Sequence, residues 1–191
     1  VPVINGLTDY NHPTQVVCDV LTMIEHAPAG KRLEELNVTF IGDATNVLSS
    51  LMLICTRLGM RFVQAAPAKY QAPAQWIEWA QENCAESGGS VHVTDDPIEA
   101  VQQADFIYTD LWWWVGQEEL FNRAPVHCKF MHCLPASRGV EVTDEVMDHP
   151  RSLIFDQSEN RLHTEKGLLV YLLYKRLPRP SPELKAYHQG Q

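Results

Sequence analysis

The sequence predicts an α/β fold, an open parallel sheet of about five strands with helices on both faces. Short apolar runs rich in β-branched and aromatic residues alternate with longer segments whose apolar residues recur at helical spacing. This alternation is typical of parallel sheets, whose strands are buried between two layers of helices. The 191 residues show no internal repeat. We therefore expect one domain over residues 1–177 and an irregular, proline-rich tail over residues 178–191.

The first half of the chain alternates regularly between the two kinds of element. We expect a helix from about residue 11 to 26, because Asn11 or Thr14 can cap it and Pro13 suits its first turn. Further helices are expected at residues 45–58, which Gly59 ends, and at residues 73–86. The intervening strands are expected at residues 37–43, 61–66 and 91–94.

The second half continues the alternation with shorter helices. Asp96 and Pro97 begin a short helix, and Thr143 caps another over residues 143–147, with acidic residues in its first turn. A long final helix is expected over residues 158–175, with leucines along one side. The remaining strands are expected at residues 106–110, 129–134 and 153–155.

The composition argues against several classes of protein. The net charge is −9 and no run is rich in Lys or Arg, whereas nucleic-acid partners require a basic surface. No run approaches the roughly 18 apolar residues of a membrane span, and no secretory signal is visible. Five cysteines without regular spacing indicate reduced thiols and a cytoplasmic location. Because the chain starts at Val1 rather than Met, we expect it to be a piece of a longer protein.

One strand end carries the strongest chemical signal. The strand at residues 129–134 runs into His132 and Cys133, and Pro135 then stops it because proline has no backbone N–H for a sheet. In an open parallel sheet, ligands bind outside the carboxyl ends of the strands. A buried histidine and a small buried thiol can also serve packing alone, so the neighbours of this pair must decide its role.

Four further polar residues fall at strand ends or helix starts, namely His12, Asn46, Asp110 and Arg161. Because the carboxyl ends of parallel strands meet at one edge of the sheet, we expect these residues to gather there with the His-Cys pair. An arginine at a helix start could clamp a phosphate or a carboxylate. Taken alone, an arginine in such a place more often forms a surface ion pair.

A nicotinamide or flavin site is disfavoured. The first strand–turn–helix contains Gly42 but lacks the second and third glycines of the dinucleotide fingerprint. The next strand ends in Ala65, Ala66 and Pro67, where an acidic partner for the ribose would be needed. A nucleotide-dependent oxidoreductase is therefore a weak alternative.

A zinc site is disfavoured as well, so we expect no metal. Two histidines and two cysteines lie between residues 127 and 133, and zinc accepts such ligands. Successive side chains of a strand point to opposite faces. Cys128 and His132 would thus point one way and His127 and Cys133 the other, and one tetrahedral site cannot collect all four.

Several of these motifs occur in one order that resembles a known family. They are His12-Pro-Thr-Gln15, Asp110 followed by a tryptophan run, His132-Cys-Leu-Pro135 and Glu159-Asn-Arg161. Over residues 1–174 the chain resembles the second half of a transcarbamylase of the ornithine and putrescine carbamoyltransferase group. The resemblance implies a Rossmann-like, amine-substrate-binding domain with part of an interdomain helix at residues 1–27. It also implies a homotrimer with active sites between subunits.

The resemblance implies transfer of the carbamoyl group of carbamoyl phosphate to an amine, without a cofactor. His12, Cys133 and Arg161 would be the catalytic residues. His12 would donate to the carbamoyl oxygen, where negative charge develops, and Arg161 would neutralise charge near the phosphate. Gln15 and the backbone of Cys133 and Leu134 would hold the carbamoyl NH2. Orientation of the two reactants supplies much of the rate in such a reaction.

The resemblance places the amine substrate against Asn46, Asp110, Trp114, Val115 and Cys133. The tryptophan run lies past a strand end, where at least one indole is expected to line a cleft or an interface. Ornithine enzymes carry a serine and a methionine where this chain has Trp114 and Val115. Loss of the serine hydroxyl weakens recognition of an α-amino acid head group, which a diamine lacks. Putrescine is therefore favoured as the amine, while Asn46 keeps the residue type of ornithine enzymes and leaves ornithine open.

Two departures from the family bear on this chain. The family's phosphate loop, Ser-Thr-Arg-Thr, does not occur in the sequence, so we expect the carbamoyl-phosphate domain to lie outside this chain and the chain alone to be inactive. The segment between Gly116 and His127 is short for the family, and residues 121–123 are expected to bridge a missing substrate loop. A non-catalytic amine-binding or assembly module is the alternative from another class.

Overall fold

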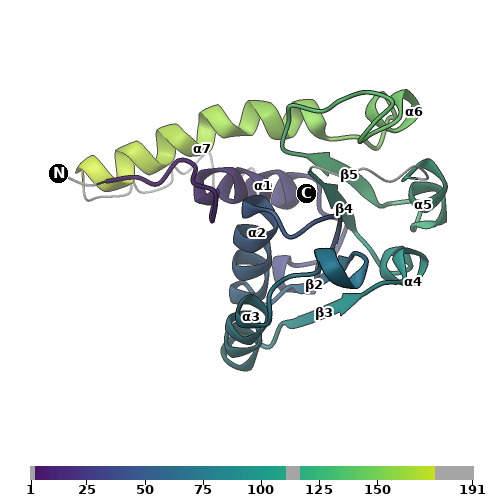
Figure 1. Ribbon diagram of the computed structural model, residues 1–191. Coiled ribbons are helices and arrows are strands. Elements are labelled where there is room, and N and C mark those ends of the chain that lie inside the picture. The colour runs from purple at the N-terminus through teal and green to yellow at the C-terminus, as the bar shows by residue number, and fades with distance from the viewer. Residues whose placement is uncertain (1–2, 111–116, 175–191) are drawn as a thin grey trace.

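The computed structural model describes residues 3–110 and 117–174. One parallel sheet with the strand order β3-β2-β1-β4-β5 forms the centre of the domain, which confirms the predicted fold class (Figure 1). Each strand falls within two residues of its predicted position. The strands are β1 (Asn37–Ile41), β2 (Arg61–Ala65), β3 (Ser90–Thr94), β4 (Phe106–Thr109) and β5 (Lys129–His132).

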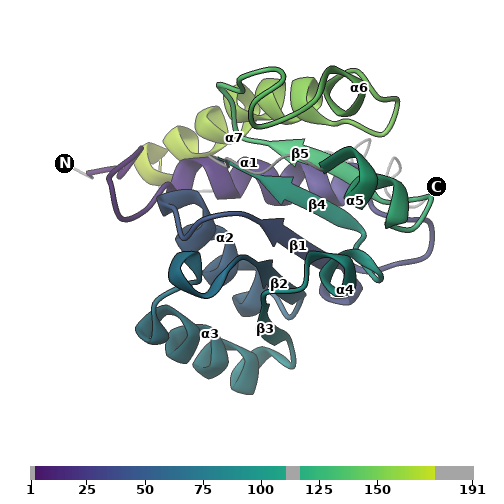
Figure 2. The same ribbon diagram turned by 45° about the vertical axis from the view of Figure 1, so that its right-hand side comes forward.

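Helices cover both faces of the sheet (Figure 2). On one side lie α1 (Pro13–Glu25), α2 (Asn46–Arg57), α3 (Ala74–Ser87) and α7 (Ile154–Tyr174), with α7 running along α1. On the other side lie α4 (Pro97–Val101), α5 (Gln117–Arg123) and α6 (Asp144–Met147). Short 3-10 turns occur at Leu33–Glu35 and Ala68–Tyr70. Within the described residues, none of these helices combines the length and the apolar character needed to cross a bilayer.

The two faces of the sheet bury separate hydrophobic clusters because side chains alternate along each strand. Phe40, Tyr108 and Met131 belong to the cluster under α1, α2 and α3. Ile107 and Phe130 belong to the cluster under α4, α5 and α6. Nearly every side chain of the central strands is therefore buried, as the continuous apolar runs in the sequence predict.

The direction in which the sheet is wound reverses between β1 and β4. The chain builds outward from β1 to β2 and β3, then returns to place β4 on the other side of β1. Ligands in doubly wound sheets bind outside the strand ends at such a reversal. The hydroxyl of Thr109 donates to the carbonyl of Ile41 at 2.7 Å and so joins the carboxyl ends of the two strands there.

The opposite edge of the sheet is held by a buried carboxylate. Asp105, which precedes β4, is fully buried and accepts a hydrogen bond from Lys31 Nζ at 2.7 Å. The backbone N–H of Asn37 and the His127 ring also bind this carboxylate, each at 2.8 Å. This cluster joins the amino ends of β1, β4 and β5, far along the strands from the predicted site.

The expected strand at residues 153–155 is wrong. Only a single bridge forms, between Phe130 and Ser152, and the carbonyl of Leu153 already accepts the N–H of Gln157 at 2.8 Å in the first turn of α7. Two of the three apolar residues that suggest a strand, Leu153 and Ile154, are instead buried at the start of this helix, 4% and 1% exposed, whereas Phe155 is 67% exposed.

Helix α5 was not predicted, because its seven residues are too few for a clear periodicity. Tertiary contacts stabilise it. Phe121 is buried and meets Phe130 edge-to-face with ring centroids 6.0 Å apart. The guanidinium of Arg151 also stacks on the Phe121 ring at 4.1 Å.

The amino end of α1 differs from its prediction. Its N-cap residue is His12 rather than Asn11 or Thr14, and the His12 side chain makes no capping hydrogen bond. Hydrogen bonds to α2 fix this turn instead: the His12 N–H donates to Ser50 Oγ at 2.9 Å, and the Asn11 amide donates to Ser49 Oγ at 3.2 Å. The His12 imidazole therefore takes no part in capping the helix.

Candidate active site

The end of β5 is fixed by hydrogen bonds on both sides of His132. The Leu134 N–H donates to His132 Nδ1 at 2.9 Å, so this ring nitrogen carries no proton. The proton is therefore on Nε2, which donates to the carbonyl of Asp110 at 3.2 Å. Burial lowers the pKa of His132, although Asp110 and Glu141 act in the other direction. His132 is thus a neutral residue that orients the turn after β5.

Cys133 and Asp110 lie together at the ends of β5 and β4. The Cys133 thiol donates to Asp110 Oδ1 at 3.2 Å. Burial, followed by the negative charge of Asp110, raises the pKa of this thiol well above its ordinary value. A thiol in this state is not a thiolate nucleophile. Cys133 can donate a hydrogen bond and shape the site, and the carboxylate of Asp110 can attract a cationic amine.

The turn that follows Cys133 has an unusual backbone. Leu134 has a φ of 59°, in the left-handed region, and its peptide bond to Pro135 is cis. The left-handed region costs a non-glycine residue roughly 1–2 kcal/mol. Residues held in such conformations concentrate at functional sites, where the surrounding structure determines the backbone direction.

His12 is the N-cap residue of α1, as its predicted place at a helix start requires, whereas Arg161 lies inside α7, which already begins at Ile154, and not at a helix start. The Nδ1 atom of His12 is buried and has no hydrogen-bond partner among the described residues. Burial and then the positive charge of Arg161 lower the pKa of His12, while a hydrogen bond with the Gly6 backbone and then the charge of Asp110 act to raise it. Arg161 and Asp110 are therefore both close enough to His12 to act on it electrostatically. The Arg161 side chain is 39% exposed, and within residues 3–110 and 117–174 its one ion pair is a long contact with Glu165, at 3.9 Å.

Gln15 lies one turn after His12 and presents an unused acceptor. Its side chain is 1% exposed, and its Nε2 donates to Asp19 Oδ1 at 2.9 Å. Its Oε1 is buried without a partner among the described residues. A buried acceptor without a donor is costly, so this oxygen is suited to receive the N–H of a ligand.

Asn46 begins α2 on the other side of the reversal between β1 and β4. Thr45 caps this helix by accepting the N–H of Leu48 at 3.3 Å. The Asn46 amide donates to the carbonyl of Thr8 at 2.7 Å, so contact with an amine would fall to its oxygen. The predicted amine-site residues Trp114 and Val115 lie outside the described residues.

The sequence reasoning missed a buried polar network behind the site. Asp19 is fully buried and accepts from Gln157 Nε2 at 2.6 Å, in addition to Gln15. Gln157 Nε2 also lies 3.0 Å from the Tyr108 hydroxyl, and Gln157 Oε1 accepts the backbone N–H of His132 at 2.9 Å. One signal was present in the sequence: Asp19 interrupts the apolar face of the first helix, four residues after Gln15.

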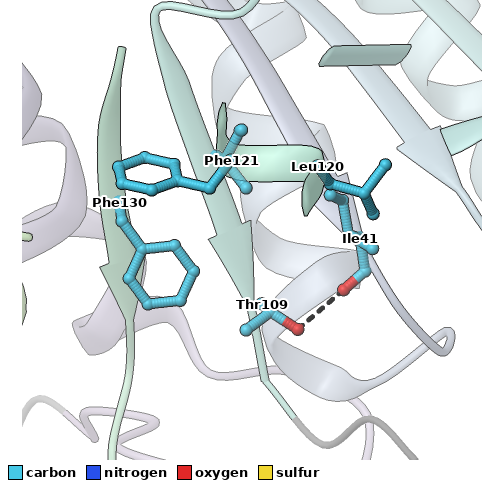
Figure 3. Close-up of a pocket in the computed structure, with 6 residues that line it drawn as sticks. Ile41, Thr109, Leu120, Phe121 and Phe130 are labelled. Carbon is cyan, nitrogen blue, oxygen red and sulfur yellow. Dashed lines mark hydrogen bonds between the residues drawn. The ribbon is translucent and has the colours of Figure 1, made fainter. Parts of the chain in front are cut away.

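A small hollow near the end of β4 is not the site. Figure 3 shows Phe121 and Phe130 beside one another in it, with the Thr109 hydroxyl turned to the Ile41 carbonyl. None of the residues that line it is charged, and the polar group of Thr109 is already paired. Its lining residues are Ile41, Ile107, Thr109, Leu120, Phe121 and Phe130.

Comparison with known proteins identifies the domain. The family model described as "Aspartate/ornithine carbamoyltransferase, Asp/Orn binding domain" matches residues 34–124 and 117–172. The chain is 50% identical, over all of its length, to a putrescine carbamoyltransferase of Mycoplasma capricolum subsp. capricolum. It is 44% identical over 91% of its length to an ornithine carbamoyltransferase of Thermococcus kodakarensis. The chain spans 59% of the length of each of these two relatives.

A solved structure agrees with this result. The ornithine carbamoyltransferase from Pyrococcus furiosus superposes with a TM-score of 0.82 at 43% identity. The match covers 89% of this chain and 59% of that one. The predicted resemblance to ornithine and putrescine carbamoyltransferases is therefore confirmed.

The comparisons also bear on the short segment before His127. The alignment with the Mycoplasma capricolum enzyme runs over 217 positions although this chain has 191 residues, so that relative carries residues that this chain lacks. The family model matches in two pieces that overlap at residues 117–124, which is where a shortened loop was expected. In the structure these residues lie in and beside a continuous helix, α5.

Proposed function

Because the chain belongs to the aspartate/ornithine carbamoyltransferase family, we propose that the protein transfers the carbamoyl group of carbamoyl phosphate to putrescine. The products are N-carbamoylputrescine and phosphate. One observation carries the proposal beyond the family match. The buried His12 Nδ1 and Gln15 Oε1 atoms, at the start of α1, have no partner among the described residues, and Arg161 and Asp110 both act electrostatically on His12.

In the proposed mechanism the neutral amine attacks the carbamoyl carbon, the bond between that carbon and the phosphate oxygen breaks, and the proton lost by the amine nitrogen passes to the departing phosphate. Negative charge develops on the carbamoyl oxygen, and fixed donors lower the barrier if they are aimed at it. His12 is proposed to supply such a donor and Arg161 to supply positive charge beside it. Gln15 Oε1 and the carbonyl groups of Cys133 and Leu134 are proposed to accept from the carbamoyl NH2.

The amine is proposed to bind between Asn46, Asp110 and Cys133, with Trp114 and Val115 completing its pocket. The Asp110 carboxylate, directed by the Cys133 thiol at 3.2 Å, suits the cationic end of a diamine. Two relatives named putrescine carbamoyltransferase, at 50% and 51% identity, support putrescine. Ornithine, which would give citrulline, is the second candidate, because the relative named ornithine carbamoyltransferase is 44% identical.

We propose a homotrimer in the cytoplasm, with each site completed by a carbamoyl-phosphate domain outside this chain. The proposal of a further carbamoyl-phosphate domain is supported by the length of the relatives, because this chain spans 59% of the length of the Mycoplasma capricolum enzyme. A binding or assembly module without catalysis is the competing proposal. It predicts that the full-length protein binds an amine and transfers nothing to it.

The test is an assay of the full-length protein with carbamoyl phosphate and each amine in turn. We expect transfer to both amines to be measurable and kcat/KM to favour putrescine by at least tenfold, which is about 1.4 kcal/mol of transition-state stabilisation. A tenfold preference for ornithine would replace the substrate. No transfer to either amine would favour the binding module.

A further inference from the structure

Asp19 lies at the centre of the buried network behind the site. Its side chain is fully buried in α1, and one oxygen, Oδ1, accepts from Gln15 Nε2 at 2.9 Å and from Gln157 Nε2 at 2.6 Å. Burial raises the pKa of Asp19 to about 6, so the group is largely an acceptor-only carboxylate at neutral pH.

An acceptor-only neighbour decides which way an amide points. The nitrogen of a glutamine amide is a donor and its oxygen is an acceptor. A carboxylate at 2.9 Å can accept only from the nitrogen, so the Gln15 amide must place Nε2 on Asp19 and turn Oε1 away from it. The same reasoning fixes Gln157, whose oxygen then accepts the His132 N–H at 2.9 Å.

The Gln15 oxygen that is turned away from Asp19 is left without a donor from the described part of the protein. This oxygen is buried and has no hydrogen-bond partner among the described residues, and the same is true of Nδ1 of His12, one turn earlier. His12 is the N-cap residue of α1 and Gln15 lies in its first turn, so both unpartnered atoms belong to the start of this helix. Neither atom is expected to stay unpaired when the site is filled.

We infer that Asp19 is a positioning residue, whose carboxylate holds the Gln15 amide so that its oxygen accepts from the carbamoyl NH2. The inference rests on the proposed function, which supplies the ligand that this oxygen receives. Through Gln157 the same carboxylate supports the end of β5 that carries Cys133. Asp19 itself does not contact the substrate in this account.

The experiment is a double-mutant cycle in the full-length protein. Gln15→Ala and Asp19→Ala should each raise KM for carbamoyl phosphate about tenfold with little change in kcat, because the contact exists before and during the reaction. The double variant should be clearly less impaired than the roughly hundredfold product of the two single effects, because Asp19 acts mainly through Gln15 and only its support of β5 through Gln157 adds to the loss. Asp19→Asn should stay within about threefold of wild type, since its side-chain oxygen can still accept from the Gln15 amide.

A second pair of variants exchanges the amide and the carboxylate between positions 15 and 19, and so tests the same contact without deleting the Asp19 side chain. Gln15→Glu places two carboxylates against each other and should lose about tenfold in kcat/KM. Adding Asp19→Asn supplies an N–H for the new carboxylate and should restore kcat/KM to within about threefold. Thr39→Val is the control for a lost buried hydrogen bond, since the Thr39 hydroxyl donates to the Ala100 carbonyl at 2.9 Å away from the site. This control should leave KM unchanged.

The outcomes separate the inference from the function. An active wild-type protein whose two alanine effects multiply to about a hundredfold would overturn the positioning role alone. So would a Gln15→Glu variant that Asp19→Asn fails to restore. A wild-type protein without transfer to either amine would overturn the proposed function, and the role of Asp19 with it.

Discussion

The buried carboxylate of Asp19 should make the stability of the domain depend on pH in an unusual direction. Burial raises its pKa from the ordinary value of 3.8 to about 6, although hydrogen bonds from Gln15 and Gln157 oppose the shift. Between these two pKa values the folded chain binds more protons than the unfolded chain. Stability linked to this group is therefore full at low pH and is lost as the pH rises toward 6 and above.

The magnitude follows from the same difference. A shift of roughly two pH units at 1.36 kcal/mol per unit corresponds to about 3 kcal/mol. Asp19→Asn removes the titration and keeps the shape of the side chain. The unfolding free energy of wild type minus that of this variant should therefore fall by about 2–3 kcal/mol from pH 4 to pH 7.

Urea denaturation of both proteins at each pH measures this difference. Asp148→Asn serves as a control of opposite sign, because Arg138 lowers the pKa of the exposed Asp148 carboxylate. Its difference from wild type should rise with pH rather than fall. If the unfolding free energy of wild type minus that of Asp19→Asn were independent of pH, or grew with pH, burial of the ionised Asp19 carboxylate would not destabilise the folded domain and the reasoning would be refuted.

Other perturbations test the remaining charged and reactive groups. Arg161→Gln should raise the pKa of His12 in an NMR titration, because the Arg161 charge lowers it. An unchanged His12 pKa would show that Arg161 does not act on His12. Lys31→Met should cost about 2 kcal/mol in urea denaturation, below the roughly 3–5 kcal/mol for breaking a fully buried pair, because Lys31 is 34% exposed; no loss would contradict the role of the Asp105 cluster. Iodoacetamide at pH 8 should label Cys84, which is partly exposed, before buried Cys133; mass spectrometry that found Cys133 labelled first would contradict a protonated, hydrogen-bonded thiol.

The sheet could be predicted because its signals are local. Short apolar runs that end at turn or polar residues mark buried parallel strands, and β1, β2, β4 and β5 lie at such runs, whereas the edge strand β3 is only half-buried. The prediction of a strand at residues 153–155 was wrong because an apolar run of three residues fits a strand or a buried helical turn equally well. Only the packing of Leu153 and Ile154 against the rest of the domain selects the helix.

The residue types of the candidate site could be predicted from the sequence, but the hydrogen bonds that connect them could not. The topology alone brings the ends of β1, β4 and β5 to one edge, so Asp110 and Cys133 could be expected to meet, and they do at 3.2 Å. The roles of Asp19 and Gln157 depend on contacts between residues 138 positions apart in the chain, which no local pattern encodes. The neutral state of His132 likewise required its two ring contacts, with Leu134 and Asp110.

The central claim is that a carbamoyl group binds between the start of α1 and the turn after β5. A crystal structure of the full-length protein with carbamoyl phosphate tests it most directly. We expect the carbamoyl nitrogen within about 3 Å of Gln15 Oε1, a hydrogen-bond distance, and the carbamoyl oxygen on His12. A carbamoyl group bound elsewhere, or a Gln15 amide whose oxygen is turned back to Asp19, would contradict it.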